Sequence, residues 1–405
     1  MKEFFIVFLF LVTAYSDLYS QGVWSKDTST GFVERRSATS SVINGKIYAI
    51  GGKPFTGIAP VQIFDPILHQ WSTPVINEDL NIGFWSTANV VNREIYVMGG
   101  LAFQNTGLGD TLCIFDPGSN SWNLPTITGF FAHRLDFTSS VVNGKIYVFG
   151  GQDSIIITTV DVFDPSTNTW ATPVTTGTFT PRYGLSSAVV NGKIYVMGGN
   201  GGNASNYLPV STMEVFDPAT NSWSTPSTIG SLYPRQFFTS CVLDNKIYVI
   251  GGDIGGMINP TNSVQIFDPA MNSWTQLFAD GNLTPRMQLT SCVVNGKIYV
   301  LGGYIPHQEL NTVEVYDPNG SDVRTTTAAN DRFSILSNPI TSSADFQFDA
   351  LKEPTVFELF DALGRSVLRR ELPAGQASLH IDMQKYPSGI YFARLGGKVI
   401  RFAKM

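Results

Sequence analysis

Most of the chain consists of short segments in which apolar and polar residues alternate, the period of a half-buried β-strand. Two such segments, strands a and b, recur as a pair around a two-residue turn, and strand b, for example Lys46–Ile50, ends at a Gly-Gly pair. Asn-Gly between two alternating runs predicts a β-hairpin, because both turn residues need positive φ. The six turns are Asn44-Gly45, Asn92-Arg93, Asn143-Gly144, Asn191-Gly192, Asp244-Asn245 and Asn295-Gly296.

A third predicted strand, strand c, ends at an Asp-Pro dipeptide in every repeat. Proline cannot donate a ladder hydrogen bond and opens a turn, so the strand stops there. In five of the six repeats a tryptophan follows six residues after the aspartate and marks strand d. The aspartates are Asp65, Asp116, Asp164, Asp217, Asp268 and Asp317, and the tryptophans are Trp71, Trp122, Trp170, Trp223 and Trp274.

The Gly-Gly pairs recur at intervals of 48, 51, 48, 53 and 51 residues. A four-stranded repeat of this length, with a Gly-Gly pair and a periodic tryptophan, resembles the kelch repeat. The resemblance covers roughly residues 22–323 and implies an all-β fold. Over residues 21–323 it implies a six-bladed β-propeller in which each repeat forms one four-stranded blade.

The sixth repeat lacks its tryptophan, because Val323 stands six residues after Asp317. Near the start of the chain, Trp24 lies 11 residues before Arg35, and the other five tryptophans lie 12 residues before the matching position. We therefore predict that the segment around Trp24 supplies the outermost strand of the last blade. This closure leaves no free sheet edge in the ring.

The first residues have the pattern of an export signal. Lys2 precedes an apolar run from Phe4 to Val12, which is too short to span a bilayer but suits the core of a signal peptide. We expect residues 1–20 to be removed by cleavage after Ser20, with cleavage after Ser16 as the alternative.

The composition supports a protein of many packed strands, with 43% apolar and 14% charged residues. The net charge is −6, and neither the repeats nor the C-terminal residues carry a basic field, which excludes nucleic acid as the main partner. An odd count of three cysteines argues against a disulfide framework. We expect Cys113, Cys241 and Cys292 to be free thiols.

After a polar linker over residues 324–333, the segment 334–405 has its own alternating pattern. It resembles the type A C-terminal sorting domain of the type IX secretion system. The resemblance implies a small β-sandwich that the outer-membrane translocon recognises and that is usually removed after transit. The alternative is a domain that binds ligand or packs on the propeller. The matching motifs are Ser337-Asn338-Pro339, Phe360-Asp361-Ala362-Leu363-Gly364-Arg365 and Pro387-Ser388-Gly389-Ile390-Tyr391.

We predict the binding site on the face that carries the d-to-a and b-to-c loops, because binding residues tend to lie on variable loops held by a rigid scaffold. From the second glycine to the last aromatic residue of strand c, the six repeats differ, with 12 to 17 residues. An arginine enters strand a from the same face in five repeats, and such a ring would attract a carboxylate or sulfate. These arginines are Arg35, Arg134, Arg182, Arg235 and Arg286.

The alternative for the arginines is structural: each would bond backbone carbonyls and link neighbouring blades. The kelch pattern itself includes such an arginine, which favours this alternative. The second repeat has Gly83 at that position, followed by Phe84 and Trp85. Trp85 suits an aromatic binding platform and a core position equally.

Polar and aromatic residues after the Gly-Gly pairs are further candidates on the same face. Asn, Asp and Tyr beside aromatic residues suit sugar hydroxyls, although each is also an ordinary loop residue. The main candidates are Asp153, Asn200, Asp253 and Tyr304, and Gln152, Asn203 and His307 lie close to them in the sequence.

Catalytic signals are sparse. The four histidines do not recur at ligand spacing, so we expect no metal and no cofactor, and no nucleophile elbow or phosphate loop is present. Glu214 and Glu314 lie in strand c where the kelch pattern often has Glu, which favours a structural role. The sequence therefore favours a binding protein over an enzyme.

We expect a monomeric propeller, secreted or held on the outer surface of a bacterium, that recognises a glycan or a cell-surface protein. Its C-terminal domain would engage the type IX secretion machinery. The alternative left open is a kelch-type isomerase resembling a sialic acid mutarotase, or a lyase acting on an acidic sugar.

Overall fold

The structure, a computed structural model, describes residues 22–53, 61–76, 80, 82–100, 112–201, 208–255, 258–279, 281, 283–320, 333–336, 340–361, 365–396 and 398–404. All regular elements among these residues are strands, so the predicted all-β class is confirmed. Among them no helix is long and apolar enough to cross a membrane. The predicted signal peptide, Val323 and residues 324–332 of the predicted linker lie outside the described residues.

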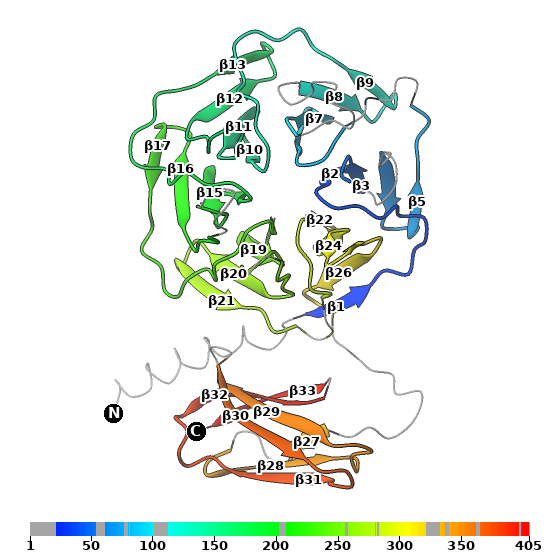
Figure 1. Cartoon of the computed structure of the whole chain (residues 1–405), viewed down its shortest axis with the longest axis vertical. Coiled ribbons are helices and arrows are strands. Elements are labelled where there is room, and N and C mark those ends of the chain that lie inside the picture. The colour runs from blue at the N-terminus through cyan, green and yellow to red at the C-terminus, as the bar shows by residue number, and fades with distance from the viewer. Residues whose placement is uncertain are drawn as a thin grey trace, which may run out of the picture. The chain divides into compact units, whose positions relative to one another are not determined.

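The chain divides into two compact units, Met1–Asp322 and Val323–Met405. In the first unit, six four-stranded antiparallel sheets form the blades of a propeller around a central channel (Figure 1). Strand a of each blade is innermost. These strands are β2 (Thr39–Ile43), β6 (Thr87–Val91), β10 (Thr138–Val142), β14 (Ser186–Val190), β18 (Thr239–Leu243) and β22 (Thr290–Val294).

Strands b, c and d follow outwards in each blade, in the predicted order. Strands b are β3 (Lys46–Ile50), β7 (Glu94–Met98), β11 (Lys145–Phe149), β15 (Lys193–Met197), β19 (Lys246–Ile250) and β23 (Lys297–Leu301). Strands c are β4 (Gln62–Asp65), β8 (Leu112–Asp116), β12 (Val160–Asp164), β16 (Met213–Asp217), β20 (Val264–Asp268) and β26 (Val313–Asp317). Strands d are β5 (Gln70–Ser72), β9 (Ser121–Asn123), β13 (Thr169–Ala171), β17 (Ser222–Ser224), β21 (Ser273–Gln276) and β1 (Val23–Lys26), and blade 6 adds the short ribbon β24 (Tyr304–Ile305) and β25 (Gln308–Glu309).

The hairpin turns between strands a and b have the predicted geometry. Asn44 and Gly45 have φ of 52° and 74°, the left-handed values that this turn needs. Arg93 and Asn245, which replace glycine in two repeats, adopt the same conformation with φ of 68° and 58°. The turn is therefore kept even where the residue costs some backbone strain.

The ring closes as the tryptophan spacing predicts. Strand β1 pairs with β26, so that the first and last strands of the propeller share blade 6 (Figure 1). Trp24 lies opposite Tyr316, in the register that places Trp122 opposite Phe115 in blade 2. The Trp24 and Tyr316 rings lie 5.3 Å apart, and Trp24 is 7% exposed. The N-terminal strand thus completes the last blade.

Apolar residues fill the space between neighbouring blades in six separate clusters. Between blades 1 and 2, for example, Tyr48 packs with Ile95 and Phe115. The three thiols, of Cys113, Cys241 and Cys292, are free and belong to such clusters. Each blade is thus held by side-chain packing on both flanks.

Each Gly-Gly pair joins its blade to the next one through the backbone. The N–H of Gly303 donates to the carbonyl of Arg35 at 2.9 Å and so links blade 6 to blade 1. A Cβ on Gly302 would lie 2.4 Å from the same carbonyl oxygen, so only glycine allows this approach. The other five links run from Gly52 to Gly83, Gly100 to Arg134, Gly151 to Arg182, Gly199 to Arg235 and Gly252 to Arg286.

Hydroxyl groups of the innermost strands form a second belt of links around the channel wall. The second residue of strand a is a serine in five blades and Ala88 in blade 2, where the hydroxyl is therefore missing. The hydroxyl pairs are Ser40–Thr290, Thr87–Ser139, Thr138–Ser187, Ser186–Ser240 and Thr239–Ser291, at 2.6 to 2.9 Å.

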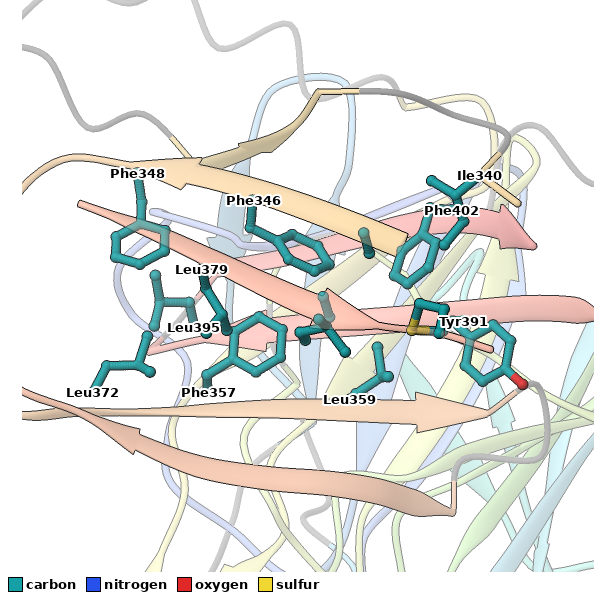
Figure 2. Close-up of a cluster of buried hydrophobic side chains, with 14 residues drawn as sticks. Ile340, Phe346, Phe348, Phe357, Leu359, Leu372, Leu379, Tyr391, Leu395 and Phe402 are labelled. Carbon is teal, nitrogen blue, oxygen red and sulfur yellow. The ribbon is translucent and has the colours of Figure 1, made fainter. Parts of the chain in front are cut away.

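The second unit is a pair of sheets around its own apolar core. One sheet has the order β27-β28-β31 and the other β30-β29-β32-β33. Figure 2 shows Phe346, Leu379 and Phe357 among the buried side chains between them. The strands are β27 (Phe333–Ile335), β28 (Ser343–Phe348), β29 (Thr355–Asp361), β30 (Ser366–Leu372), β31 (Ser378–Asp382), β32 (Gly389–Leu395) and β33 (Lys398–Lys404).

Candidate binding site at the channel mouth

The five arginines of the sequence pattern are buried, with 0 to 1% of their surface exposed. In four blades the guanidinium donates to the carbonyl of the first glycine of the Gly-Gly pair, as Arg286 does to Gly302 at 2.8 Å. In blade 4, Arg182 instead donates to the carbonyl of Val196 at 3.1 Å. The second partner is always a side chain of strand c. The pairs are Arg35–Gln62, Arg134–Asp161, Arg182–Glu214, Arg235–Gln265 and Arg286–Glu314.

Blade 2 replaces both members of this pair at once. Gly83 stands at the arginine position, and Cys113 occupies the strand-c position that holds an acid or amide elsewhere. A buried carboxylate without its cation would cost several kcal/mol, so the two replacements are physically coupled. The carbonyl of Gly83 still accepts the link from Gly52 at 3.0 Å. The asymmetry at Gly83 therefore leaves the ring intact.

These contacts support the structural alternative for the arginines. Burial lowers the pKa of Arg35 and Arg235 to about 10, which keeps both cationic at neutral pH. Their guanidinium groups do not reach solvent, so they offer no exposed ring of cations to a carboxylate. Glu214 and Glu314 are likewise buried as arginine partners, in line with their expected structural role.

Two of the predicted loop candidates also belong to the scaffold. Asn200 and Asp253 are 0% and 5% exposed and bond the two sides of one carboxamide, that of Gln236. Asn200 Nδ2 donates to Gln236 Oε1 at 2.8 Å, and Gln236 Nε2 donates to Asp253 Oδ2 at 2.9 Å. This chain joins blades 4 and 5 below the surface.

The remaining loop candidates are more accessible. Asp153 lies 3.2 Å from His133, and its side chain is 55% exposed. Tyr304 accepts a hydrogen bond from the backbone of His307, and the Arg36 guanidinium lies 4.6 Å from its ring centre. Asn203 lies outside the described residues.

Six residues encircle the channel mouth. Of these, the sequence pattern predicted only Trp85 as a site residue. Each stands two residues after the arginine position, and each has a left-handed backbone with φ from 52° to 64°. We call this set the mouth ring. Its members are Ser37, Trp85, Asp136, Gly184, Phe237 and Gln288.

Backbone hydrogen bonds connect neighbouring members of the mouth ring at five of its six blade junctions. The links run from Ser37 N to Gln288 O, Trp85 N to Ser37 O, Gly184 N to Asp136 O, Phe237 N to Gly184 O and Gln288 N to Phe237 O, at 2.7 to 3.2 Å. Because these backbone atoms are committed to the links, the five side chains and the space left at Gly184 define the chemistry of the mouth.

The mouth ring lines a cavity of about 110 Å³. Trp85 and Phe237 belong to blades 2 and 5, on opposite sides of the six-membered ring, and Asp136 and Gln288 belong to blades 3 and 6, also opposite. A Cβ on Gly184 would lie 3.0 Å from the Phe237 ring, so glycine makes room for this aromatic group. The mouth ring thus places an aromatic pair and a polar pair on opposite sides of the cavity.

Asp136 carries the main electrostatic feature of the cavity. Although part of the residue is accessible, desolvation in this narrow space raises the pKa of its carboxyl to about 7. Its one polar side-chain contact in the described structure is Gln152 Nε2, 3.5 Å from Oδ2. A carboxyl kept near its titration point in a concave site is typical of functional positions.

Other polar atoms at the mouth lack partners among the described residues. Ser86 Oγ, Gln288 Oε1 and Trp85 Nε1 are shielded from solvent and make no hydrogen bond there. Shielded atoms without a described partner also occur away from the mouth, for example at Trp122, Ser29 and Gln276, so they do not by themselves mark a site. A buried polar atom without a partner costs about 1–3 kcal/mol of stability.

The mouth ring has a sequence signal that a search for repeated residues overlooks. Its neighbours, the arginine and the following strand a, repeat from blade to blade, whereas this position is Ser, Trp, Asp, Gly, Phe and Gln in turn. At a repeat position that differs in every copy, the scaffold does not require a particular side chain, so that side chain is available for binding. Trp85 is the one sequence-predicted residue that lines the cavity.

The described residues contain no group of three or more His, Cys, Asp or Glu placed to hold a metal ion. In the second unit, the sorting-type motifs close local turns. Arg365 donates through Nε to Asp361 at 2.7 Å, and Tyr391 Oη donates to the carbonyl of Pro387 at 2.7 Å. Ser337-Asn338-Pro339 lies outside the described residues.

The arginine pairs generate a stability prediction for blade 4. Arg182→Met should lower the free energy of unfolding by about 3–5 kcal/mol, because Glu214 stays buried without its cation. Adding Glu214→Cys, which copies blade 2, should recover part of that loss. Urea unfolding followed by tryptophan fluorescence measures both variants.

The control is Lys193→Met in the same blade, which breaks a half-exposed ion pair with Asp217 and should cost about 0–1 kcal/mol. A loss for Arg182→Met as small as that of the control would contradict the structural role of the arginine. So would a double variant in which the two losses simply add.

Comparison with known proteins identifies both units. The KLHDC2/KLHL20/DRC7 Kelch-repeats domain matches residues 85–303 and 201–337. The secretion system C-terminal sorting domain matches residues 334–402.

Individual relatives are similar in the propeller. Kelch-like protein 23 of Pongo abelii is 26% identical over 278 residues, 67% of this chain and 46% of that protein. Kelch-like protein 25 of Xenopus tropicalis is 27% identical over 240 residues, 57% and 38% of the two chains. Kelch domain-containing protein 3 of Bos taurus is 25% identical over 289 residues, 70% and 64%. The chain spans less than half the length of the two kelch-like proteins. With six blades, their glycine links and this match, the chain belongs to the kelch-repeat family and carries a secretion system C-terminal sorting domain.

Proposed function

We propose that the protein is an exported binding module whose propeller recognises a glycan or a cell-surface protein through the channel mouth. The observation that carries the proposal is the mouth ring, in which one repeated backbone position carries six different residues, five of them with a side chain. The scaffold holds that position by hydrogen bonds and leaves its side chains free for recognition.

The surrounding loops support the same face. The d-to-a and b-to-c loops meet there in short antiparallel bridges, for example between Gln236 and Asp253. These bridges keep the loop bases rigid, so the loops can present a preformed surface at low entropic cost on binding. The other face carries the a-to-b turns, four of which are Asn-Gly, and the Asp-Pro turns.

An isomerase or lyase for acidic sugars is the competing function, and Asp136 is the observation in its favour. A carboxyl with a pKa near 7 can carry a proton in either direction at neutral pH. An acidic sugar, however, needs a cation, and no Lys, Arg or His lines the cavity. The charge of the cavity therefore argues against turnover of an anionic substrate and supports a binding function.

Trp85→Ala and Phe237→Ala test the proposal. Each should weaken binding of the protein to its glycan or protein ligand by about tenfold or more, because each removes one aromatic wall of the cavity. A glycan array and pull-down from outer-membrane protein extracts measure binding, and an anomerisation assay with sialic acid measures turnover.

Met271→Ala is the matched control, since Met271 is 67% exposed on a c-to-d turn of the opposite face. Loss of binding in this control and not in the mouth variants would place the site elsewhere. Turnover that depends on Asp136 would show the enzyme instead.

A sorting domain of this kind implies export through the type IX system to the cell surface or beyond. We propose that residues 334–405 act only in sorting, because the six blades close without them. Deletion of residues 334–405 should leave a folded propeller in the periplasm, as followed by fractionation and immunoblotting. Normal amounts of the truncated protein on the surface or in the medium would contradict a sorting role and assign this domain to binding.

A further inference from the structure

We infer that the mouth cavity binds a primary ammonium group, presented as the side chain of a lysine on a partner protein. This inference rests on the proposed function and specifies its ligand. It follows from the charge, the aromatic walls and the size of the cavity, and from the apolar loops beside it.

The charge of the cavity is the first argument. Asp136 is the one ionisable residue among its lining residues. The nearby cations are already engaged: Arg36 pairs with Glu309 at 3.5 Å, and Lys53 lies 5.7 Å from the centre of the Phe84 ring. Arg134, two residues before Asp136, is paired with Asp161. A cationic ligand would meet a carboxylate without competition from a cation of the protein.

The hydrogen-bonding capacity of the mouth points the same way. The Asp136 carboxylate belongs to the lining of the cavity and accepts hydrogen bonds. An ammonium group has three donors and no acceptor. It can therefore donate to this carboxylate, which would repel the carboxylate of an anionic ligand.

The two aromatic rings are the second argument. Trp85 packs against Phe84 with ring centres 4.4 Å apart, and Phe237 packs near Tyr183 at 6.3 Å. Both rings are thereby held in place at the cavity wall. A cation next to an aromatic face gains about 0.5–2 kcal/mol, most with tryptophan.

The size of the cavity limits the ligand to a narrow group. Its volume is about 110 Å³, well below the roughly 300–1,000 Å³ of pockets that enclose a whole small molecule. A lysine side chain is an unbranched stem with a compact charge at its end and fits such a space. An oligosaccharide would have to remain outside it.

The loops beside the cavity favour a protein over a sugar as the carrier of the ammonium group. Four isoleucine and leucine side chains on the b-to-c loops of blades 3, 4 and 5 are between 45% and 74% exposed. The loops of blades 4 and 5 approach each other where a Cβ on Gly255 would lie 3.6 Å from Pro209. Exposed apolar groups on adjacent loops are typical of protein interfaces. These residues are Ile155, Leu208, Ile254 and Ile258.

The test uses the full chain labelled with ¹⁵N, with the indole N–H resonance of Trp85 as the reporter. The probes are Nα-acetyl-lysine amide, its Nε-acetylated form and glucosamine. Nα-acetyl-lysine amide should shift the resonance saturably, and the Nε-acetylated form should bind at least tenfold more weakly because it lacks the charge. Glucosamine should bind more weakly than the lysine probe, because it lacks the long stem.

Asp136→Asn should weaken binding of the lysine probe at least tenfold, whereas the matched control Asp164→Asn, which changes a carboxyl of the same blade at a turn of the opposite face, should leave it unchanged. Equal binding of the acetylated probe, or full binding by Asp136→Asn, would overturn the ammonium site. Tighter binding of glucosamine would overturn lysine as the source.

Failure of this inference can be told from failure of the proposed function. If no probe moves the Trp85 resonance but Trp85→Ala still reduces binding in the glycan array or the pull-down, the mouth binds a ligand of another class. If neither effect is seen, the proposed function itself fails.

Discussion

The structure depends on one close approach, repeated six times. The second glycine of each pair donates its N–H to a backbone carbonyl of the next blade, and the first glycine leaves no room for a Cβ beside that carbonyl. Because donor and acceptor are backbone groups, the circle does not depend on the side chain at the arginine position. It tolerates Gly83 in blade 2, and the last link, from Gly303 to Arg35, joins the two ends of the propeller.

The buried arginines reinforce this circle and explain why the binding chemistry lies elsewhere. Each guanidinium is used up by carbonyls and by a strand-c partner in the interior. Two residues further on, the chain turns through a left-handed conformation at the channel mouth, and there the repeat no longer constrains the side chain. The rigid circle of glycine links thus supports the variable mouth ring. The mouth ring holds Asp136, whose desolvated carboxyl costs stability. Such a local conflict with stability is expected at functional positions.

Much of the fold could be predicted from the sequence because it is specified locally and six times over. Asn-Gly turns, Asp-Pro stops and the spacing of Trp24 each follow from backbone chemistry. The site was harder to predict, because it is defined by position in the ring. Repeated residues such as Arg235 were candidate binding residues in the sequence but are buried, and Asn200 and Asp253 are scaffold residues. Asp136 and Phe237 carry no motif, and only closure of the ring brings them to one cavity with Trp85.

The central claim is that the channel mouth is a binding site built around the carboxyl of Asp136. The most direct measurement is a ¹³C NMR titration of that carboxyl in the free protein and with saturating Nα-acetyl-lysine amide. A carboxyl desolvated in the cavity should titrate near pH 7, and a bound ammonium group should stabilise its ionised form and lower the midpoint. A midpoint near the ordinary aspartate value of about 4, unchanged by the probe, would contradict the account.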